Sequence, residues 1–167
     1  MIPLSTAIYP RFIADCNVGK LARLLRMMGY DTLFFRHIED GDLVDIALEE
    51  HRIILTRDTQ IALRRVVVSG QLRTILLDSD DHREQLHQLV ELLDLKCDTT
   101  PFTRCLECND PLIPRSKNEV RHVVPSHVFL TQTNYMQCPS CDRVYWRGTH
   151  WKHMTEELQK MTIGRVE

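Results

Sequence analysis

The sequence has no long hydrophobic run, no large charge excess and no internal repeat, and each absence excludes a class of protein. No run approaches the length that crosses a membrane, so we predict no membrane association. The N-terminus lacks a basic stretch followed by an apolar core, so we expect no secretory signal and a cytoplasmic location. The net charge of −2 gives no nucleic-acid-binding signature over the whole chain. A nucleic-acid-binding surface, if present, must therefore be local.

The composition is that of an ordinary globular protein. Of the 167 residues, 43% are hydrophobic and 26% are charged, which suits one domain or one domain with a small module. Four of the six cysteines fall into two C-x-x-C pairs. This pairing favours a metal site in a reducing compartment over a disulfide framework.

The first half of the chain alternates short apolar runs with segments of helical periodicity. We predict strands at 11–14, 30–35, 53–56 and 74–77, and helices at 18–28, 39–50, 59–67 and 82–93. Three of the strands are nearly unbroken apolar runs, which is typical of a parallel sheet buried on both faces. The predicted fold class is therefore α/β, with helices on both faces of a parallel sheet.

An acid stands between the first predicted strand and the first helix. Asp15 ends the apolar run, Asn17 is suited to cap the helix, and Gly29 lies where a helix commonly stops. Ligands of open α/β sheets bind outside the carboxyl ends of the strands, so Asp15 is either a helix cap or a functional residue. Basic residues spaced by three give the helix a stripe that is either a solvated face or a binding surface: Lys20, Arg23 and Arg26.

Acidic residues recur at the predicted strand ends. Right-handed crossovers place the carboxyl ends of parallel strands at one edge of the sheet, so we expect these acids to converge. Each acid taken singly is more typical of a helix cap. Together they would repel one another and favour a divalent cation. The acids are Asp15, Asp58, the pair Asp40 and Asp42 that begins the second helix, and the cluster at 78–81 that contains Asp78 and Asp80.

The charge of the chain changes sign after the segment Asp-Thr-Thr-Pro at 98–101. Residues 1–98 hold 12 Lys and Arg against 16 Asp and Glu, whereas residues 99–154 hold 7 against 4, so the net charge changes from −4 to +3. We therefore predict a boundary here, with a basic module after it.

Two C-x-x-C knuckles separated by 29 residues dominate the second segment. Four thiolates suit tetrahedral Zn²⁺ in a closed structural site, and a zinc ribbon can hold an extra hairpin between its knuckles. A redox pair or an iron–sulfur cluster is the alternative. The predicted ligands are Cys105, Cys108, Cys138 and Cys141.

Basic and aromatic residues surround the knuckles. Arg143 and Arg147 lie beside Tyr145, Trp146 and Trp151, a mixture that binds phosphates and stacks on bases. The aromatic residues equally suit the small core of a ribbon and the docking of the last helix. His150 and His153 are interpreted as surface or RNA-facing residues.

Several of these stretches resemble the Mut-seven C-terminal ribonuclease family, in which a PIN-like nuclease domain precedes a zinc ribbon. The resemblance covers about 12–154, although Val18 replaces the usual leucine. It implies a PIN-like domain at 11–97, a zinc ribbon at 98–154 and a C-terminal helix and tail at 155–167. The matching stretches are 12–15, 18–23, 29–31 and 55–58 in the first half, and 105–109, 138–141 and 143–150 in the second.

The resemblance implies hydrolysis of RNA that depends on Mg²⁺ or Mn²⁺. Asp15, Asp40 and Asp58 would be the metal ligands, with Asp42 as a second candidate at the start of the second helix and Asp78 or Asp80 as a fourth acid. Substrate phosphates would contact Lys20, Arg23 and Arg57 in the first domain, and Arg143 and Arg147 in the ribbon.

The leading hypothesis is a ribonuclease that acts on single-stranded RNA. A non-catalytic RNA-binding adaptor that uses the ribbon is the second, and a toxin-like PIN component with a protein partner is the third. A protein partner or a homo-oligomer is compatible with each of them.

Overall fold

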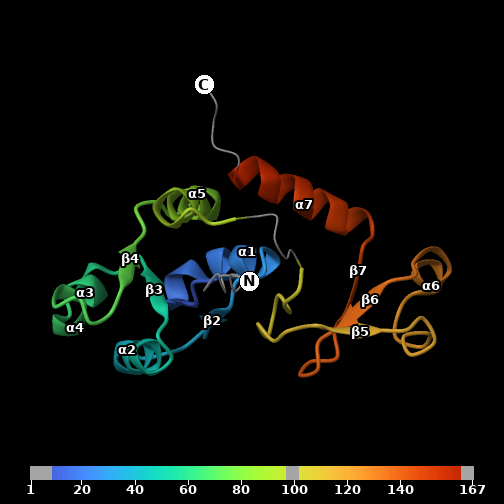
Figure 1. The fold of residues 1–167 in the computed structure, drawn as a ribbon, viewed down its shortest axis with the longest axis horizontal. Coiled ribbons are helices and arrows are strands. Elements are labelled where there is room, and N and C mark those ends of the chain that lie inside the picture. Colours follow the sequence, from blue (N-terminus) through green and yellow to red (C-terminus); the bar gives the residue numbers. More distant parts are fainter. Residues whose placement is uncertain (1–8, 97–101, 163–167) are drawn as a thin grey trace, which may run out of the picture.

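The computed structural model describes residues 9–96 and 102–162, which form two β-sheets and the helices around them (Figure 1). The first sheet is parallel, with the strand order β2-β1-β3-β4. Its strands are β1 (Phe12–Ala14), β2 (Thr32–Phe34), β3 (Ile53–Thr56) and β4 (Thr74–Leu76). The predicted α/β class and parallel sheet are confirmed.

Helices cover both faces of this sheet because its strand residues alternate between two apolar clusters. Phe12, Ala14 and Leu55 face α1 (Gly19–Met27) and α5 (His82–Leu93). Ile13 and Ile54 face the opposite side. That side is covered by α2 (Asp40–Glu49), α3 (Thr59–Ala62) and α4 (Arg65–Val68); in Figure 1, α2 lies below the sheet, and α3 and α4 lie to its left. The sheet is therefore the middle layer of three.

Two local predictions in this domain were wrong. Asn17 does not cap the first helix: Asp15 caps a short 3₁₀ turn, η1 (Cys16–Val18), which leads directly into α1. The helix predicted at 59–67 is two short helices, because Arg64 adopts an extended conformation with a ψ of 143°. Gly29 ends α1 with a φ of 92°, as its position predicted.

A close contact fixes the start of α1. A Cβ atom on Gly19 would lie 2.5 Å from Cζ of Phe34, so only glycine lets the helix approach β2 this closely. This packing sets the position of the turn that carries Asp15.

The second sheet is antiparallel, with the order β5-β6-β7. Its strands are β5 (Ile113–Arg115), β6 (Tyr135–Gln137) and β7 (Val144–Trp146). The spacer between the knuckles does not hold only an extra hairpin: it forms turns and α6 (Ser126–Thr131) between β5 and β6. Apolar side chains stabilise this segment by forming a small separate core, which consists of Val120, Val124, Val128 and Tyr135.

The last helix joins the two parts of the molecule. This helix, α7 (Thr149–Thr162), contains the predicted boundary between 154 and 155. Its Leu158 is buried in the same cluster as α1 and α5, and the Trp151 ring lies 5.2 Å from that of Phe102. The predicted boundary at 98–101 lies outside the described residues, as do positions 163–167 of the C-terminal helix and tail predicted at 155–167. The described halves share one hydrophobic core.

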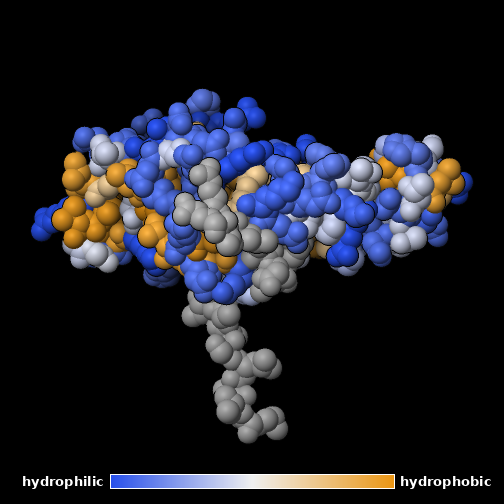
Figure 2. Space-filling model, turned by 90° about the horizontal axis from the view of Figure 1, so that it is seen from above, coloured by the Kyte–Doolittle hydropathy of each residue, from blue (hydrophilic) through white to orange (hydrophobic). Residues whose placement is uncertain are grey.

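Exposed apolar side chains gather at both ends of the long axis, over α3 and α4 at one end and over α6 at the other (Figure 2). Leu63 and Val68 belong to the first group, and Val123 and Leu130 to the second. Among the described residues, no helix is long and apolar enough to cross a membrane.

Candidate active site and metal centre

The topology of the parallel sheet identifies its carboxyl edge as the place where a ligand would bind. Strands β1 and β3 are neighbours, but α1 follows β1 on one face and α3 follows β3 on the other. Such a reversal opens a crevice outside the carboxyl ends of the two strands, where ligands of open α/β sheets bind. Asp15 directly follows β1, and Asp58 follows β3 by two residues. Both predicted acids therefore lie at the crevice.

Thr56 links these two acids. Asp15 is only 5% exposed, and its Oδ2 accepts a 2.7 Å hydrogen bond from the Thr56 hydroxyl. Its Oδ1 accepts a 2.6 Å bond from the backbone N–H of Cys16. The backbone N–H of Asp58 donates to the Thr56 hydroxyl oxygen at 2.9 Å. Sequence reasoning missed Thr56, although a hydroxyl residue at the end of an apolar strand was a visible signal.

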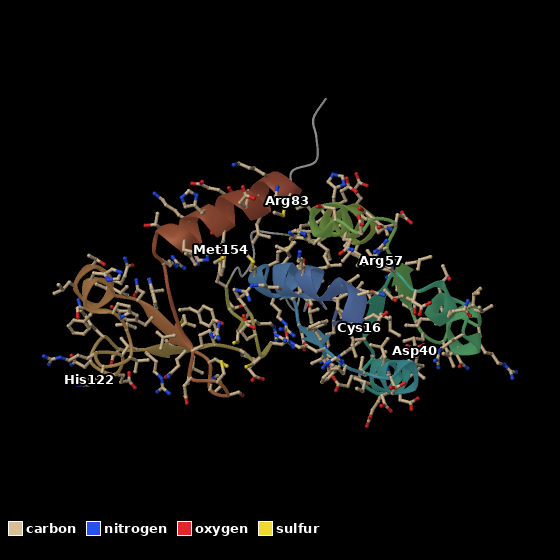
Figure 3. The ribbon with its side chains drawn as sticks, turned by 180° about the vertical axis from the view of Figure 1, so that it is seen from behind. Cys16, Asp40, Arg57, Arg83, His122 and Met154 are labelled. Carbon is tan, nitrogen blue, oxygen red and sulfur yellow. The ribbon has the colours of Figure 1, made fainter. Side chains whose placement is uncertain are left out.

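The other two predicted metal ligands lie nearby but have partners of their own. Asp58 caps α3, since its Oδ1 accepts a 2.8 Å bond from the N–H of Gln60. Asp40 begins α2 and accepts a long 3.4 Å bond from Nη2 of Arg64. Although Cys16 is exposed, incomplete solvation raises the pKa of its thiol, and the negative charges of Asp15 and Asp40 raise it further. Figure 3 shows Cys16, Asp40 and Arg57 at the same end of the molecule.

The carboxylates at this edge suit an open ion site and not a closed one. Within the part of the chain that the structure describes, they do not come close enough together to surround an ion by themselves. Mg²⁺ commonly uses only one or two carboxylates and completes its shell with waters and substrate phosphates. Asp15, with Asp40 or Asp58 beside it, offers that kind of donor set.

The remaining predicted acids lie elsewhere. Asp42 lines a hollow on the outer side of α2 together with Asp45 and Glu49. Asp78 and Asp80 follow β4, which β3 separates from β1. The cap of α5 is their neighbour Asp81, whose pKa is lowered by the N–H groups of Arg83 and Glu84. Among the described residues, Asp42, Asp78 and Asp80 form no group of three or more potential metal ligands with Asp15.

The two cysteine knuckles have the same backbone fold. In each, the first cysteine accepts a bond at its carbonyl from the N–H four residues later, with lengths of 2.9 and 3.1 Å. In each, its N–H donates to the carbonyl five residues later, at 2.8 and 3.0 Å. The residue after the second cysteine is left-handed, with φ of 70° at Asn109 and 58° at Asp142. Asn and Asp tolerate this conformation better than most residues.

The four thiols form one cluster. Their Sγ atoms all lie within 4.8 Å of one another, and Cys105 and Cys141 are 3.7 Å apart. Tetrahedral bonds of about 2.3 Å to one zinc ion require a separation near this value. Burial and the neighbouring sulfurs raise the pKa of Cys108 to about 12, since crowded thiols cannot all ionise without a cation. The cluster could therefore hold a metal such as zinc.

The sequence model of the Mut7-C RNAse domain matches residues 10–158. The chain belongs to this family. The match spans the parallel sheet and the cysteine module, so it confirms the resemblance drawn from the sequence. It also indicates a ribonuclease-like role and RNA as the ligand. No curated protein and no solved structure matches the chain.

The predicted phosphate-binding residues of this Mut7-C domain differ in how they are held. Lys20 and Arg57 are exposed. Arg23 and Arg143 both pair with Glu107, which lowers the pKa of that carboxyl chiefly through its bond to Arg23. Glu107 was not predicted as their partner. The guanidinium of Arg147 lies 5.1 Å from the Trp151 ring centre.

Arg26 contradicts the interpretation of its stripe as a solvated face. It is buried and donates to the carbonyl oxygens of Thr32, Leu106 and Glu107 at 2.9, 2.9 and 3.0 Å. This burial lowers the pKa of Arg26. Arg26 therefore fastens the first cysteine knuckle of the Mut7-C domain to α1.

Proposed function

We propose that this Mut7-C protein is a divalent-metal-dependent ribonuclease that cleaves single-stranded RNA at the carboxyl edge of its parallel sheet. The observation that carries the proposal is the buried carboxylate of Asp15, fixed by Thr56 and by the N–H of Cys16 at the point where the sheet topology reverses. The family match supports the choice of RNA as substrate.

Each residue at this edge has a role in the proposal. Asp15, Asp40 and Asp58 would hold Mg²⁺ or Mn²⁺, and a bound ion supplies activated water and stabilises negative charge on the attacked phosphate. The two hydrogen bonds to Asp15 keep one carboxylate oriented before substrate arrives. Lys20 and Arg57 are exposed and would contact the RNA backbone.

We further propose that the cysteine cluster holds one zinc ion with a structural role. The four clustered thiolates would fill the tetrahedral shell of zinc, so no coordination position would be left for a substrate. Four unpaired thiols also favour a reducing compartment, namely the cytoplasm.

A cleavage assay tests the proposal. Labelled single-stranded and hairpin RNAs are incubated with the zinc-loaded protein, with Mg²⁺, with Mn²⁺ or with EDTA, and beside the Asp58→Asn variant. We expect the single strand to be cut only with added metal, and the variant to bind RNA but to cut it far more slowly. Cleavage in EDTA at the same rate would overturn metal dependence, and an unfolded variant would reduce Asp58 to a helix cap.

A non-catalytic adaptor is the second candidate, because Asp58 caps α3 and Asp40 pairs with Arg64. Binding of RNA by the wild-type protein without cleavage in Mg²⁺ or Mn²⁺ would favour it. Light scattering of the purified protein would at the same time show whether it forms a homo-oligomer.

A further inference from the structure

A groove of about 370 Å³ runs between α1, the start of α5 and α7. Its floor is apolar and includes Met27, Met154 and Leu158. Figure 3 shows Met154 on the side of α7 that faces the rest of the molecule. Its rim carries nitrogen-bearing side chains from all three helices: Lys20, Arg23, His82, His150 and His153.

We propose that this groove binds one unpaired nucleotide of the RNA, next to the position that is cleaved. The proposal rests on the proposed function and adds a subsite to it. Lys20 is the second residue of α1, whose 3₁₀ extension is capped by Asp15. At roughly 1.5–2 Å per helical residue, the groove begins within about two turns of the acidic edge.

The lining of the groove matches the two parts of a nucleotide, since the apolar floor suits the base and the nitrogen-bearing rim suits the phosphate. A base is flat and largely apolar on its faces, and the thioethers of the methionines make favourable contacts with such rings. The phosphate on either side meets Lys20, Arg23 and the imidazoles, which donate hydrogen bonds. Ligand pockets have volumes of about 300–1,000 Å³, so this groove takes one small unit and not a duplex.

One carboxylate also lines the groove, and it is already paired. Glu157 accepts a 2.9 Å bond from Nη2 of Arg83 and lies 3.9 Å from the amine of Lys160. Glu107 offsets the charge of Arg23, so Lys20 supplies the remaining positive charge of the rim, which favours a phosphate over a cationic ligand. This charge pattern selects RNA among the ligands that an apolar groove accepts.

A chemical footprint tests the subsite without relying on cleavage. The Asp15→Asn protein, loaded with zinc, is treated with diethyl pyrocarbonate alone, with an eight-nucleotide oligouridylate, and with a duplex of the same length. Mass spectrometry then reports the modification of each histidine. We expect the single strand to protect His150 and His153 at least threefold, while His122 and His127 near α6 react as before. Equal reactivity with and without RNA, or equal protection by the duplex, would overturn the subsite.

Matched charge reversals provide the second test. We expect His150→Glu with His153→Glu to weaken binding of the oligouridylate about tenfold, because two negative charges would face its phosphates. The control pair, His122→Glu with His127→Glu, should change binding less than twofold. Equal effects of the two pairs would contradict the proposal. If the variant with His150→Glu and His153→Glu fails to fold, the chemical footprint, which uses a protein with all its native histidines, tests the subsite by itself.

Different outcomes would reject the subsite and the nuclease. Protection of the groove without any cleavage by the wild-type protein would keep the subsite and reject the nuclease. Cleavage with no protection and no loss of affinity in the groove variant would keep the nuclease and reject the subsite. Protection by an acidic peptide but not by RNA would assign the groove to a protein.

Discussion

The two edges of the parallel sheet treat their acids in opposite ways. At the carboxyl edge, the one ion pair of Asp15, Asp40 and Asp58 in the described part of the chain is the 3.4 Å contact of Asp40 with Arg64. At the amino edge, Asp31 alone lies near three guanidinium groups: Arg52 at 2.7 Å, Arg11 at 3.2 Å and Arg104 at 3.9 Å. Guanidinium groups therefore neutralise the acid at the amino edge, whereas the acids at the carboxyl edge keep most of their negative charge, which suits the binding of a cation.

The amino edge also holds the cysteine module. The side chain of Asn109 donates to Asp31 at 2.8 Å and accepts from the N–H of Thr32 at 2.8 Å. Arg104 donates to the carbonyl of Gly29 at 3.3 Å. Both residues stand directly beside the cysteines, so the metal centre and the Asp31 cluster form one structural unit.

The largest expected effect comes from breaking that unit. Cys138→Ser should abolish metal binding, because structural zinc contributes on the order of 10 kcal/mol in small modules. The ribbon should unfold, and the sheet should remain but melt at a lower temperature, since its amino edge loses Arg104 and Asn109. Plasma mass spectrometry and circular dichroism would measure both changes.

Cys16→Ser is the matched control for this change, because its thiol is exposed at the opposite edge. It should leave one zinc per chain. Disulfides among the four knuckle cysteines, or a metal-free wild-type protein, would refute the zinc assignment.

Asp15→Asn should act on chemistry instead of on stability. It removes one negative charge from the carboxyl edge, and metal activation of water is worth several kcal/mol, so cleavage should fall about a thousandfold. RNA affinity should hold or rise, because fewer carboxylates face the phosphates. Single-turnover cleavage and fluorescence anisotropy would separate the two quantities. Asp45→Asn, on the outer side of α2, should behave like the wild type, and a folded Asp15→Asn protein that cuts at the normal rate would reject the site.

Asp31→Asn should show the reverse pattern. The Asp31 carboxylate forms an ion pair with Arg52, and the exposed fractions of the two side chains are 18% for Asp31 and 4% for Arg52. Its loss should lower the free energy of unfolding by about 1–2 kcal/mol, after allowance for solvent at its open side. Urea denaturation would measure this, and the cleavage rate of the folded protein should not change. A thousandfold loss of cleavage here would erase the distinction between the edges.

The acid pH dependence follows from the same residue. Burial raises the pKa of Asp31, but the bonds from Arg52 and Asn109 outweigh it and lower the pKa to about 2 from 3.8. Because the folded pKa is the lower one, the contribution is complete above about pH 4 and is lost as the pH falls toward 2. The difference in stability between wild type and Asp31→Asn should therefore shrink through this window.

The two smallest effects should come from Arg57→Gln and Arg143→Gln. Arg57 is exposed beside Asp58, and loss of one phosphate contact should weaken RNA binding about threefold to tenfold and reduce the salt slope by about 1. Arg143→Gln should do less, since Glu107 already offsets its charge at 3.6 Å. Titrations at several salt concentrations would rank the two, and a larger effect for Arg143 would move the RNA toward the ribbon.

The sequence predicted those features that depend on local pattern. The strands, the two-faced sheet and the knuckles were predictable because apolar runs and C-x-x-C spacing are read from neighbouring residues. The split near Arg64 was not, because the bond from Arg64 to Asp40 joins residues 24 positions apart. The turns and α6 between the knuckles likewise depend on a small apolar core that spacing alone does not reveal.

The placement of Asp15 and Asp58 at one edge of the sheet was predictable, but the contacts around them were not. Asp15 and Asp58 could be placed at one edge from chain order. Their connection through Thr56 needs the register of β1 with β3, which only the folded sheet provides. Arg26 is the clearest failure, since its carbonyl partners at Leu106 and Glu107 lie about 80 positions away.

The shared core also determines when the protein can complete its folding during synthesis. The cluster that joins α1 and α5 is completed by Leu158 of α7, so its apolar surface stays uncovered until ribosomal synthesis has passed that position. A nascent chain that stops earlier presents Leu24 and Met27 to water and to other chains, which favours aggregation. Because these residues also line the floor of the groove, the proposed nucleotide subsite is assembled only after α7 has been translated.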